Sequence, residues 1–104
     1  MGIHAKRRDL NHAEIRDALR AVGWSVYDSG SVGKDFPDLV VGAAGLTFLV
    51  EIKSAAGRLS EGQQEFARLW RGGRVIIAYS AEQAICLITE GIAQWQTHER
   101  NGAI

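Results

Sequence analysis

Cysteine and proline are almost missing from this chain, since each occurs once, as Cys86 and Pro37. A single cysteine excludes a disulfide bond within one chain. Because Cys86 lies in the apolar run "AICLI", we expect it to be a buried structural thiol. The three histidines, His4, His12 and His98, show no metal-ligand spacing with Cys86 or with one another, so each is expected to be a surface residue.

The sequence also lacks an excess of charge and any long apolar run. Twelve basic residues balance twelve acidic ones, so composition gives no general electrostatic argument for a nucleic-acid, membrane or acidic partner. No run approaches the roughly 20 apolar residues that span a bilayer. The N-terminal stretch "MGIHAKRRDLNHAE" lacks the apolar segment of a secretory signal. We therefore expect a cytoplasmic protein with no membrane association.

With 104 residues, of which 46% are apolar and 23% charged, the chain has the balance of one globular domain, residues 1–104. Residues 11–22 are predicted to form a helix, with Asn11 as its N-cap and Gly23 as its terminator. The apolar residues that recur there at three- and four-residue spacing are Ala13, Ile15, Ala18, Leu19 and Val22.

Strands are predicted at residues 24–29, 38–43, 46–53 and 74–80, and the two middle ones are the richest in β-branched and apolar residues. A second helix is predicted from Ser60 to about residue 71, stopped by the pair of glycines at 72 and 73, with Phe66, Leu69 and Trp70 as its apolar face. A third helix is predicted over 81–90 with Ser80 as N-cap, and the tail after Gly91 stays unassigned. This order of elements predicts an α/β fold with a mixed sheet.

The two middle strands are expected to pair as a hairpin. If Ala44 and Gly45 form a two-residue loop, residues whose numbers sum to 89 face each other, and Asp38 faces Glu51. Directly opposed side chains lie about 5 Å apart on one face of a sheet, so the two carboxylates repel each other unless a positive group lies between them. A divalent cation would remove that repulsion.

Lys53 follows Glu51 by two residues, so its side chain is expected on the same face, while Ile52 points into the core. Mg²⁺ accepts one or two protein carboxylates and leaves positions for phosphate oxygens, an arrangement that suits hydrolysis of a phosphodiester. The alternative is that these charges merely reach solvent at the strand ends. A one-residue change of loop length would also turn Asp38 to the opposite face.

At these residues the sequence resembles the PD-(D/E)XK nuclease superfamily, through Pro37-Asp38 and Glu51-Ile52-Lys53. The segments "GKDFPDLVVG", "FLVEIKSAAGRLSEGQQEF" and "RVIIAYSAEQA" together resemble the VRR-NUC branch, especially its small stand-alone members in phages and bacteria. The resemblance covers the core of the chain, about residues 11–88.

This resemblance implies a restriction-endonuclease-like core, in which a mixed central β-sheet is flanked by α-helices. It also implies DNA cleavage that depends on Mg²⁺ or Mn²⁺ and, among small members, homodimers that act on branched DNA such as Holliday junctions. The residues matching the family's site are Asp38 and Glu51 as metal-binding acids, Lys53 as the catalytic lysine, the Ile52 carbonyl as a backbone ligand, and Glu14 and Gln63 as further members.

Two of these residues have an alternative interpretation. Asn11 with Glu14, and Ser60 with Gln63, each have the spacing of a capping box, in which the third helical side chain returns to the N-cap backbone. The neighbouring Gln64 also leaves the alignment of the glutamine open by one residue, although "LSEGQ" favours Gln63.

The leading hypothesis is therefore a metal-dependent DNA endonuclease. One rival is a non-catalytic nucleic-acid-binding module that kept a nuclease-like fold, and another is a purely structural interaction domain. The intact set of Asp38, Glu51 and Lys53 favours the enzyme, because an unused site would be free to lose any of the three.

Overall fold

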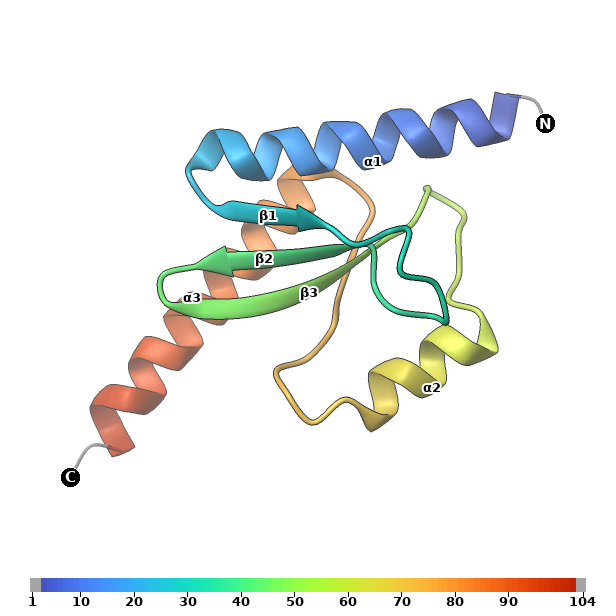
Figure 1. Cartoon of the computed structure of the whole chain (residues 1–104). Coiled ribbons are helices and arrows are strands. Elements are labelled where there is room, and N and C mark those ends of the chain that lie inside the picture. The colour runs from blue at the N-terminus through green and yellow to red at the C-terminus, as the bar shows by residue number, and fades with distance from the viewer. Residues whose placement is uncertain (1–2, 103–104) are drawn as a thin grey trace.

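The computed structural model describes the backbone of residues 3–102 and the side chains of residues 10–101. The described elements follow the predicted order of helix, three strands, helix, strand and helix (Figure 1). They are α1 (Ile3–Val22), β1 (Ser25–Asp28), β2 (Leu39–Ala43), β3 (Leu46–Ile52), α2 (Glu61–Leu69), β4 (Ile76–Ala78) and α3 (Ala81–Gly102).

The described strands form one sheet in the order β1-β2-β3-β4. The first three strands pair antiparallel with one another, whereas β4 pairs parallel with β3. The prediction of a mixed sheet is therefore confirmed. Because β3 and β4 run in the same direction, the segment that connects them must travel the length of the sheet, and α2 lies within that segment.

The predicted register of the central hairpin is confirmed. The paired residues of β2 and β3 run from Ala43 opposite Leu46 to Leu39 opposite Val50, and every pair sums to 89. The next step of the same register brings Asp38 opposite Glu51. Both residues of the turn have positive φ, 53° at Ala44 and 79° at Gly45, as a two-residue type I′ connection requires.

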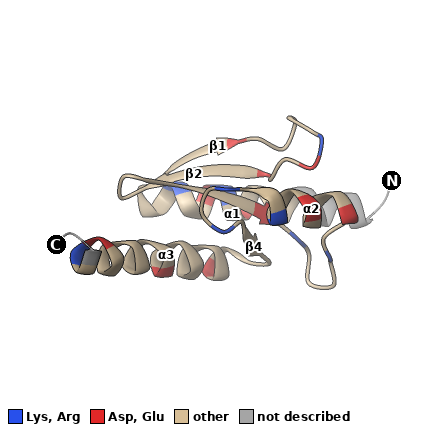
Figure 2. Ribbon diagram, turned by 90° about the horizontal axis from the view of Figure 1, so that it is seen from below, with Lys and Arg blue, Asp and Glu red and all other residues tan. Residues whose placement is uncertain are grey.

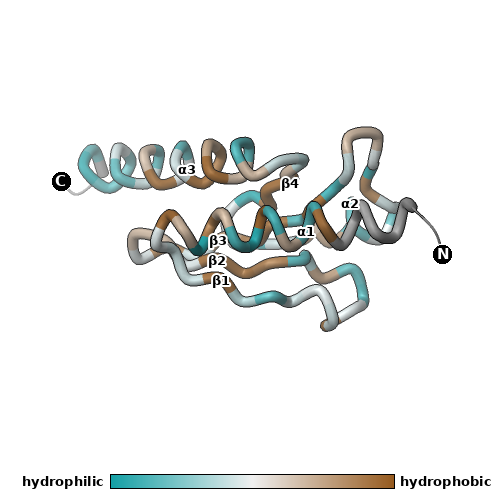
Figure 3. Tube along the Cα trace, turned by 90° about the horizontal axis from the view of Figure 1, so that it is seen from above, coloured by the Kyte–Doolittle hydropathy of each residue, from teal (hydrophilic) through white to brown (hydrophobic). Residues whose placement is uncertain are grey.

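The buried residues come from one face of the sheet and from the two long helices. Alternate residues of β2 are buried, so this strand turns one face toward the core. Figure 3 shows hydrophobic stretches along β2 and β4, and alternating hydrophobic and hydrophilic residues along α1 and α3. The core cluster consists of Ile15, Leu19, Leu39, Val41, Ala43, Val50, Ile76, Ala78, Ala84 and Ile88.

Helix α1 is longer than predicted, because it begins at Ile3 rather than after Asn11. The prediction that Asn11 caps this helix is wrong, and the capping-box interpretation of Asn11 and Glu14 falls with it. No glycine or proline interrupts the sequence from Ile3 to Val22, so nothing local stops the helix from extending toward the N-terminus. The Asn11 amide instead donates to the backbone carbonyl of Lys53.

Helix α3 continues through the tail that the sequence left unassigned, and it runs from Ala81 to Gly102. Gly91 allows this helix to approach β3 closely, since a Cβ there would lie 2.8 Å from Cε1 of Phe48. The Ser80 hydroxyl accepts from the backbone N–H of Gln83, as predicted for an N-cap. The prediction that Cys86 is buried is wrong, because it lies on the exposed face of α3.

Helix α2 also differs from its prediction, since it ends at Leu69 and none of its residues is buried. The expected apolar face does not enter the core: Leu69 is 56% exposed and Trp70 is 42% exposed. The aromatic residues pack on one another instead. Phe66 stacks on Trp70 and meets Phe36 edge-on, with ring centroids 5.5 Å and 5.6 Å apart.

Charged residues are interspersed over all three described helices, as Figure 2 shows, in keeping with the zero net charge of the sequence. Within residues 3–102, no helix combines the length and the apolar character needed to cross a membrane.

The hairpin turn gives a first testable prediction. Ala44 carries a Cβ in the left-handed region, which costs roughly 1 kcal/mol, whereas asparagine tolerates that conformation. We expect Ala44→Asn to raise the free energy of unfolding by about 0.5–1 kcal/mol in urea denaturation, without changing the m-value. Ala44→Val is the matched control and should lower it. A loss of stability in the asparagine variant would contradict the type I′ assignment.

Candidate active site

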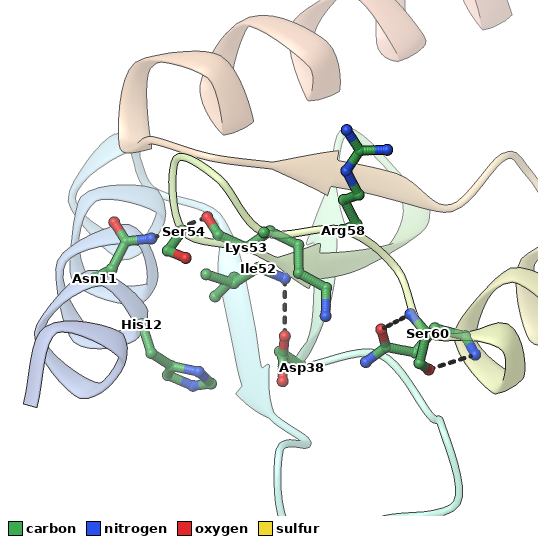
Figure 4. A pocket seen from close by; sticks show the side chains of 10 residues that line it. Asn11, His12, Asp38, Ile52, Lys53, Ser54, Arg58 and Ser60 are labelled. Atoms are coloured by element: carbon green, nitrogen blue, oxygen red, sulfur yellow. Dashed lines mark hydrogen bonds between the residues drawn. The ribbon is translucent and has the colours of Figure 1, made fainter. Parts of the chain in front are cut away.

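A cavity of about 410 Å³ lies where β2 begins and β3 ends, between α1 and α2 (Figure 4). Three segments of the chain meet around it: α1, the start of β2, and the stretch from the end of β3 to the first turn of α2. Its lining residues are Asn11, His12, Asp38, Ile52, Lys53, Ser54, Gly57, Arg58, Ser60 and Gln63.

Asp38 directly precedes β2, and its carboxylate takes the place of a backbone carbonyl as the hydrogen-bond acceptor for the end of β3. Its Oδ2 accepts a hydrogen bond of 2.8 Å from the backbone N–H of Ile52, at the point where the β2–β3 ladder has ended. In an extended strand the N–H and C=O of one residue point to the same side. The Ile52 carbonyl is therefore directed toward the edge at which Asp38 lies.

Glu51 is almost fully buried, with 5% of its surface exposed. Its Oε2 accepts a 3.1 Å hydrogen bond from Nε2 of Gln63 and lies 3.7 Å from Nζ of Lys53. Burial, and after it the neighbouring Asp38 carboxylate, raise the pKa of Glu51 to about 7, although Lys53 acts in the opposite direction. Lys53 therefore does not offset the effects of burial and of Asp38 on Glu51, so a cation placed between the two carboxylates would stabilise their ionised forms.

Gln63 combines the two roles that the sequence analysis set against each other. Its Oε1 accepts from the backbone N–H of Ser60 in a complete capping box, while its Nε2 donates to Glu51. The amide of the neighbouring Gln64 donates to the carbonyl of Leu59 instead. Of the two glutamines, Gln63 is the one that reaches the acidic pair.

The backbone of Lys53 is fixed from two sides. Its N–H donates to the carbonyl of Ala78 in β4 at 3.0 Å, and its carbonyl accepts from the Asn11 amide in α1 at 3.3 Å. The side chain is 18% exposed, so the ammonium group is close to Glu51 yet accessible from the cavity. Asp38, Glu51, Lys53 and Gln63 are therefore brought together, as their positions in the sequence had suggested.

Glu14 is not brought to this site. It is exposed on α1 and does not line the cavity, whereas Asn11 and His12 from the preceding turn do. The sequence predicted that Asn11 is the N-cap of the helix and that His12 is a surface residue. The spacing of Asn11 with the buried Ile15 and Leu19, four and eight residues later, was the signal that Asn11 continues the inward stripe of α1.

The loop before Asp38 attaches α2 to the site. Gly33, Lys34 and Asp35 all have positive φ, of 80°, 53° and 67°, so this loop holds two non-glycine residues in the left-handed region. It brings the Asp35 carboxylate against Gly62 in the first turn of α2, where any Cβ would overlap it. Together with the edge-on contact of Phe36 and Phe66, this holds α2 beside the acids.

The donor set for a cation consists of two carboxylates and the Ile52 carbonyl. Among the described residues, no group of three or more His, Cys, Asp and Glu side chains could hold a metal ion. A zinc or calcium cage of side chains is therefore not formed within this part of the chain. Mg²⁺ needs only one or two carboxylates and retains several waters, so the acids and the unbalanced charge fit it.

The sheet and its flanking helices form an α/β domain that holds two acids and a lysine at one end of the sheet. Searches with the sequence match no family model and no curated protein. A solved structure described as a VRR_NUC domain matches with a TM-score of 0.61 and 25% sequence identity, over 79% of this chain and 94% of that one. This likeness supports membership of the VRR-NUC family, consistent with the PD-(D/E)XK superfamily, and indicates a nuclease-type function.

The raised pKa of Glu51 predicts how stability depends on pH in metal-free buffer. Its pKa is about 7 in the folded chain against an ordinary value of 4.5. When the pH falls from 7 toward 4.5, the folded state binds a proton that the unfolded state does not, so this group stabilises the fold progressively; the gain is lost as the pH rises through 7. We expect wild type to gain on the order of 1–3 kcal/mol over this interval relative to Glu51→Gln.

Urea denaturation at several pH values in the presence of a chelator measures this difference. Glu65→Gln is the control, because this carboxylate is exposed on α2 and its pKa is lowered by its hydrogen bonds to Arg68. A pH-independent difference between wild type and Glu51→Gln would contradict the proposed environment of Glu51.

The attachment of α2 gives another prediction. Because α2 has no buried residue and rests on the contact of Phe36 with Phe66, removing one ring should free the helix without unfolding the sheet. We expect Phe66→Ala to increase hydrogen exchange of the α2 amides about fivefold, since an aromatic pair contributes roughly 1 kcal/mol. The amides of β2 and β3 should exchange at the wild-type rate, and equal acceleration in both regions would refute the prediction.

Proposed function

We propose that this protein is a metal-dependent DNA endonuclease that hydrolyses phosphodiester bonds in branched DNA such as Holliday junctions. The observation that carries the proposal is the convergence of Asp38, Glu51 and Lys53 at one end of the sheet, where burial and the Asp38 carboxylate raise the pKa of Glu51. The likeness to a VRR_NUC domain supports the reaction class. The branched substrate comes from the resemblance to small VRR-NUC members.

Asp38, Glu51 and the Ile52 carbonyl are the groups that would hold Mg²⁺ or Mn²⁺. When bound, such an ion stabilises the negative charge that develops on the phosphate and makes water easier to deprotonate. The buried Glu51 and the neighbouring Asp38 are suited to this, because a cation relieves the repulsion between the two carboxylates.

The remaining groups act on the substrate and on the acids. The Lys53 ammonium, which is accessible from the cavity, orients the attacking water and stabilises charge on the phosphate. Gln63 holds the Glu51 carboxylate in position through its Nε2. Glu14 has no part in this proposal, since it is exposed outside the cavity.

We further propose that the active form is a homodimer. A domain of 104 residues with no net charge offers a narrow footprint for duplex DNA, and a dimer doubles it. Two symmetry-related sites also match a substrate in which two strands are cut at related positions.

The rival proposal is a module that binds nucleic acid without cutting it. The burial of Glu51 beside a second carboxylate favours the enzyme, because a binding module gains nothing from a buried acid that repels its neighbour next to a phosphate chain. Binding of junction DNA without cleavage in either Mg²⁺ or Mn²⁺ would decide for the rival.

Cleavage of labelled junction, flap and duplex DNA tests the proposed function. We expect cleavage with Mg²⁺ or Mn²⁺, none in EDTA, and a loss of about a hundredfold or more in Asp38→Asn and Lys53→Ala. Both variants should unfold cooperatively, near the wild-type temperature. The control Glu65→Gln, which changes an exposed carboxylate on α2, should cleave as wild type does. Full activity in either site variant would refute the assignment.

A further inference from the structure

His12 is the one histidine whose side chain lines the cavity among residues 10–101, and the proposed function leaves it without a role. Its ring reaches from α1 toward Asp38 (Figure 4). Nε2 of His12 lies 2.9 Å from Oδ2 of Asp28, at the end of β1. The side chain is 24% exposed, so it is a partly buried wall of the cavity and not the surface residue that the sequence suggested.

Asp28 is itself fixed by several partners. The Gly30 N–H donates to its Oδ1 at 3.2 Å, and Nη1 of Arg16 lies 3.5 Å from its Oδ2. Burial acts to raise the pKa of Asp28, but the hydrogen bonds from Gly30, His12 and Arg16 outweigh it and lower that pKa, so the carboxylate stays ionised. The imidazole ring of His12 is therefore held by the ionised Asp28 carboxylate, whose own position is fixed by its other partners.

Gly30 keeps the space between His12 and Asp38 open. A Cβ at this glycine would lie 3.4 Å from Cε1 of His12 and 3.9 Å from Oδ1 of Asp38. Both side chains therefore border the same small space, and the glycine leaves it free. A group bound beside Asp38 would meet the imidazole ring.

With Nε2 engaged by Asp28, Nδ1 is the ring nitrogen that remains for another partner, and no described residue provides one. An imidazolium can donate from both nitrogens. A ring placed between two anions, the Asp28 carboxylate at Nε2 and a bound phosphate at Nδ1, can donate to both in that form. A phosphate oxygen is an acceptor of the right kind for Nδ1.

We propose that Nδ1 of His12 donates a hydrogen bond to a phosphate oxygen of the DNA strand bound in the cavity, and that Asp28 is the positioning residue for the ring. This inference rests on the proposed nuclease function. It adds a second side to the substrate site, because Lys53 and Arg58 line the cavity from the segment that follows β3, whereas His12 approaches from α1.

The alternative is that the contact of His12 with Asp28 only ties α1 to β1. The two roles use different nitrogens, and two substitutions separate them. Nδ1 of histidine is bonded directly to Cγ, and the amide nitrogen of asparagine occupies a similar position. Nε2 of histidine lies one bond further from the backbone, where the amide nitrogen of glutamine can reach. His12→Asn therefore replaces the DNA-facing nitrogen, and His12→Gln replaces the nitrogen that contacts Asp28.

We expect His12→Ala and His12→Gln to lower kcat/KM for junction DNA about tenfold to a hundredfold, because each loses a hydrogen bond to a charged group. His12→Asn should remain within about fivefold of wild type. Fluorescence anisotropy in EDTA should show a weaker affinity for labelled junction DNA in the same order. Asp28→Asn, which leaves His12 in place, should raise KM. His98→Ala changes an exposed histidine on α3 and should behave as wild type.

Thermal unfolding of each variant separates a loss of contact from a loss of fold. Wild-type activity in His12→Gln together with a loss in His12→Asn would overturn the proposal in favour of the structural role, and so would wild-type activity and affinity in His12→Ala. If wild type binds junction DNA but cuts none, the nuclease proposal fails by itself. The affinities measured in EDTA then still decide whether His12 contacts the phosphate chain.

Discussion

The hydrogen bond from the Ile52 N–H to Oδ2 of Asp38 is the contact on which the site depends. It forms where the β2–β3 ladder has ended, so a side chain supplies the acceptor that the neighbouring strand no longer provides. This fixes Asp38 against the end of β3, beside Glu51. The electrostatic character of the site follows, because the pKa of Glu51 is raised by burial and by this second carboxylate.

Two helices complete the site in different ways. Helix α1 is anchored in the core through Ile15 and Leu19, and it presents Asn11 to the backbone of Lys53. Helix α2 has no buried residue, and it contributes Gln63, whose amide serves a capping box and the Glu51 carboxylate together. One face of the site is therefore part of the folded core, and the other is attached to it by a few contacts.

The sequence predicted best what local rules decide. The register of the hairpin follows from the two-residue period of strands and from a turn with Gly45, so the approach of Asp38 to Glu51 was predictable. The start of α1 was not, because no breaker marks it, and the position of His12 depends on how that helix docks against β1. Exposure of Cys86 likewise depends on the rotation of α3, which its apolar neighbours do not reveal.

Because α2 is attached by few contacts, the side of the site that it forms needs less free energy to separate than the side formed by the sheet and α1. A segment that buries little surface separates from its neighbours at a smaller free energy than the whole domain needs to unfold. Asp38 and Glu51 therefore stay in place as long as the sheet is folded. Helix α2, which carries Gln63, can separate from them and return without unfolding of the sheet. The side of the cavity that α2 forms can therefore open while the sheet stays folded.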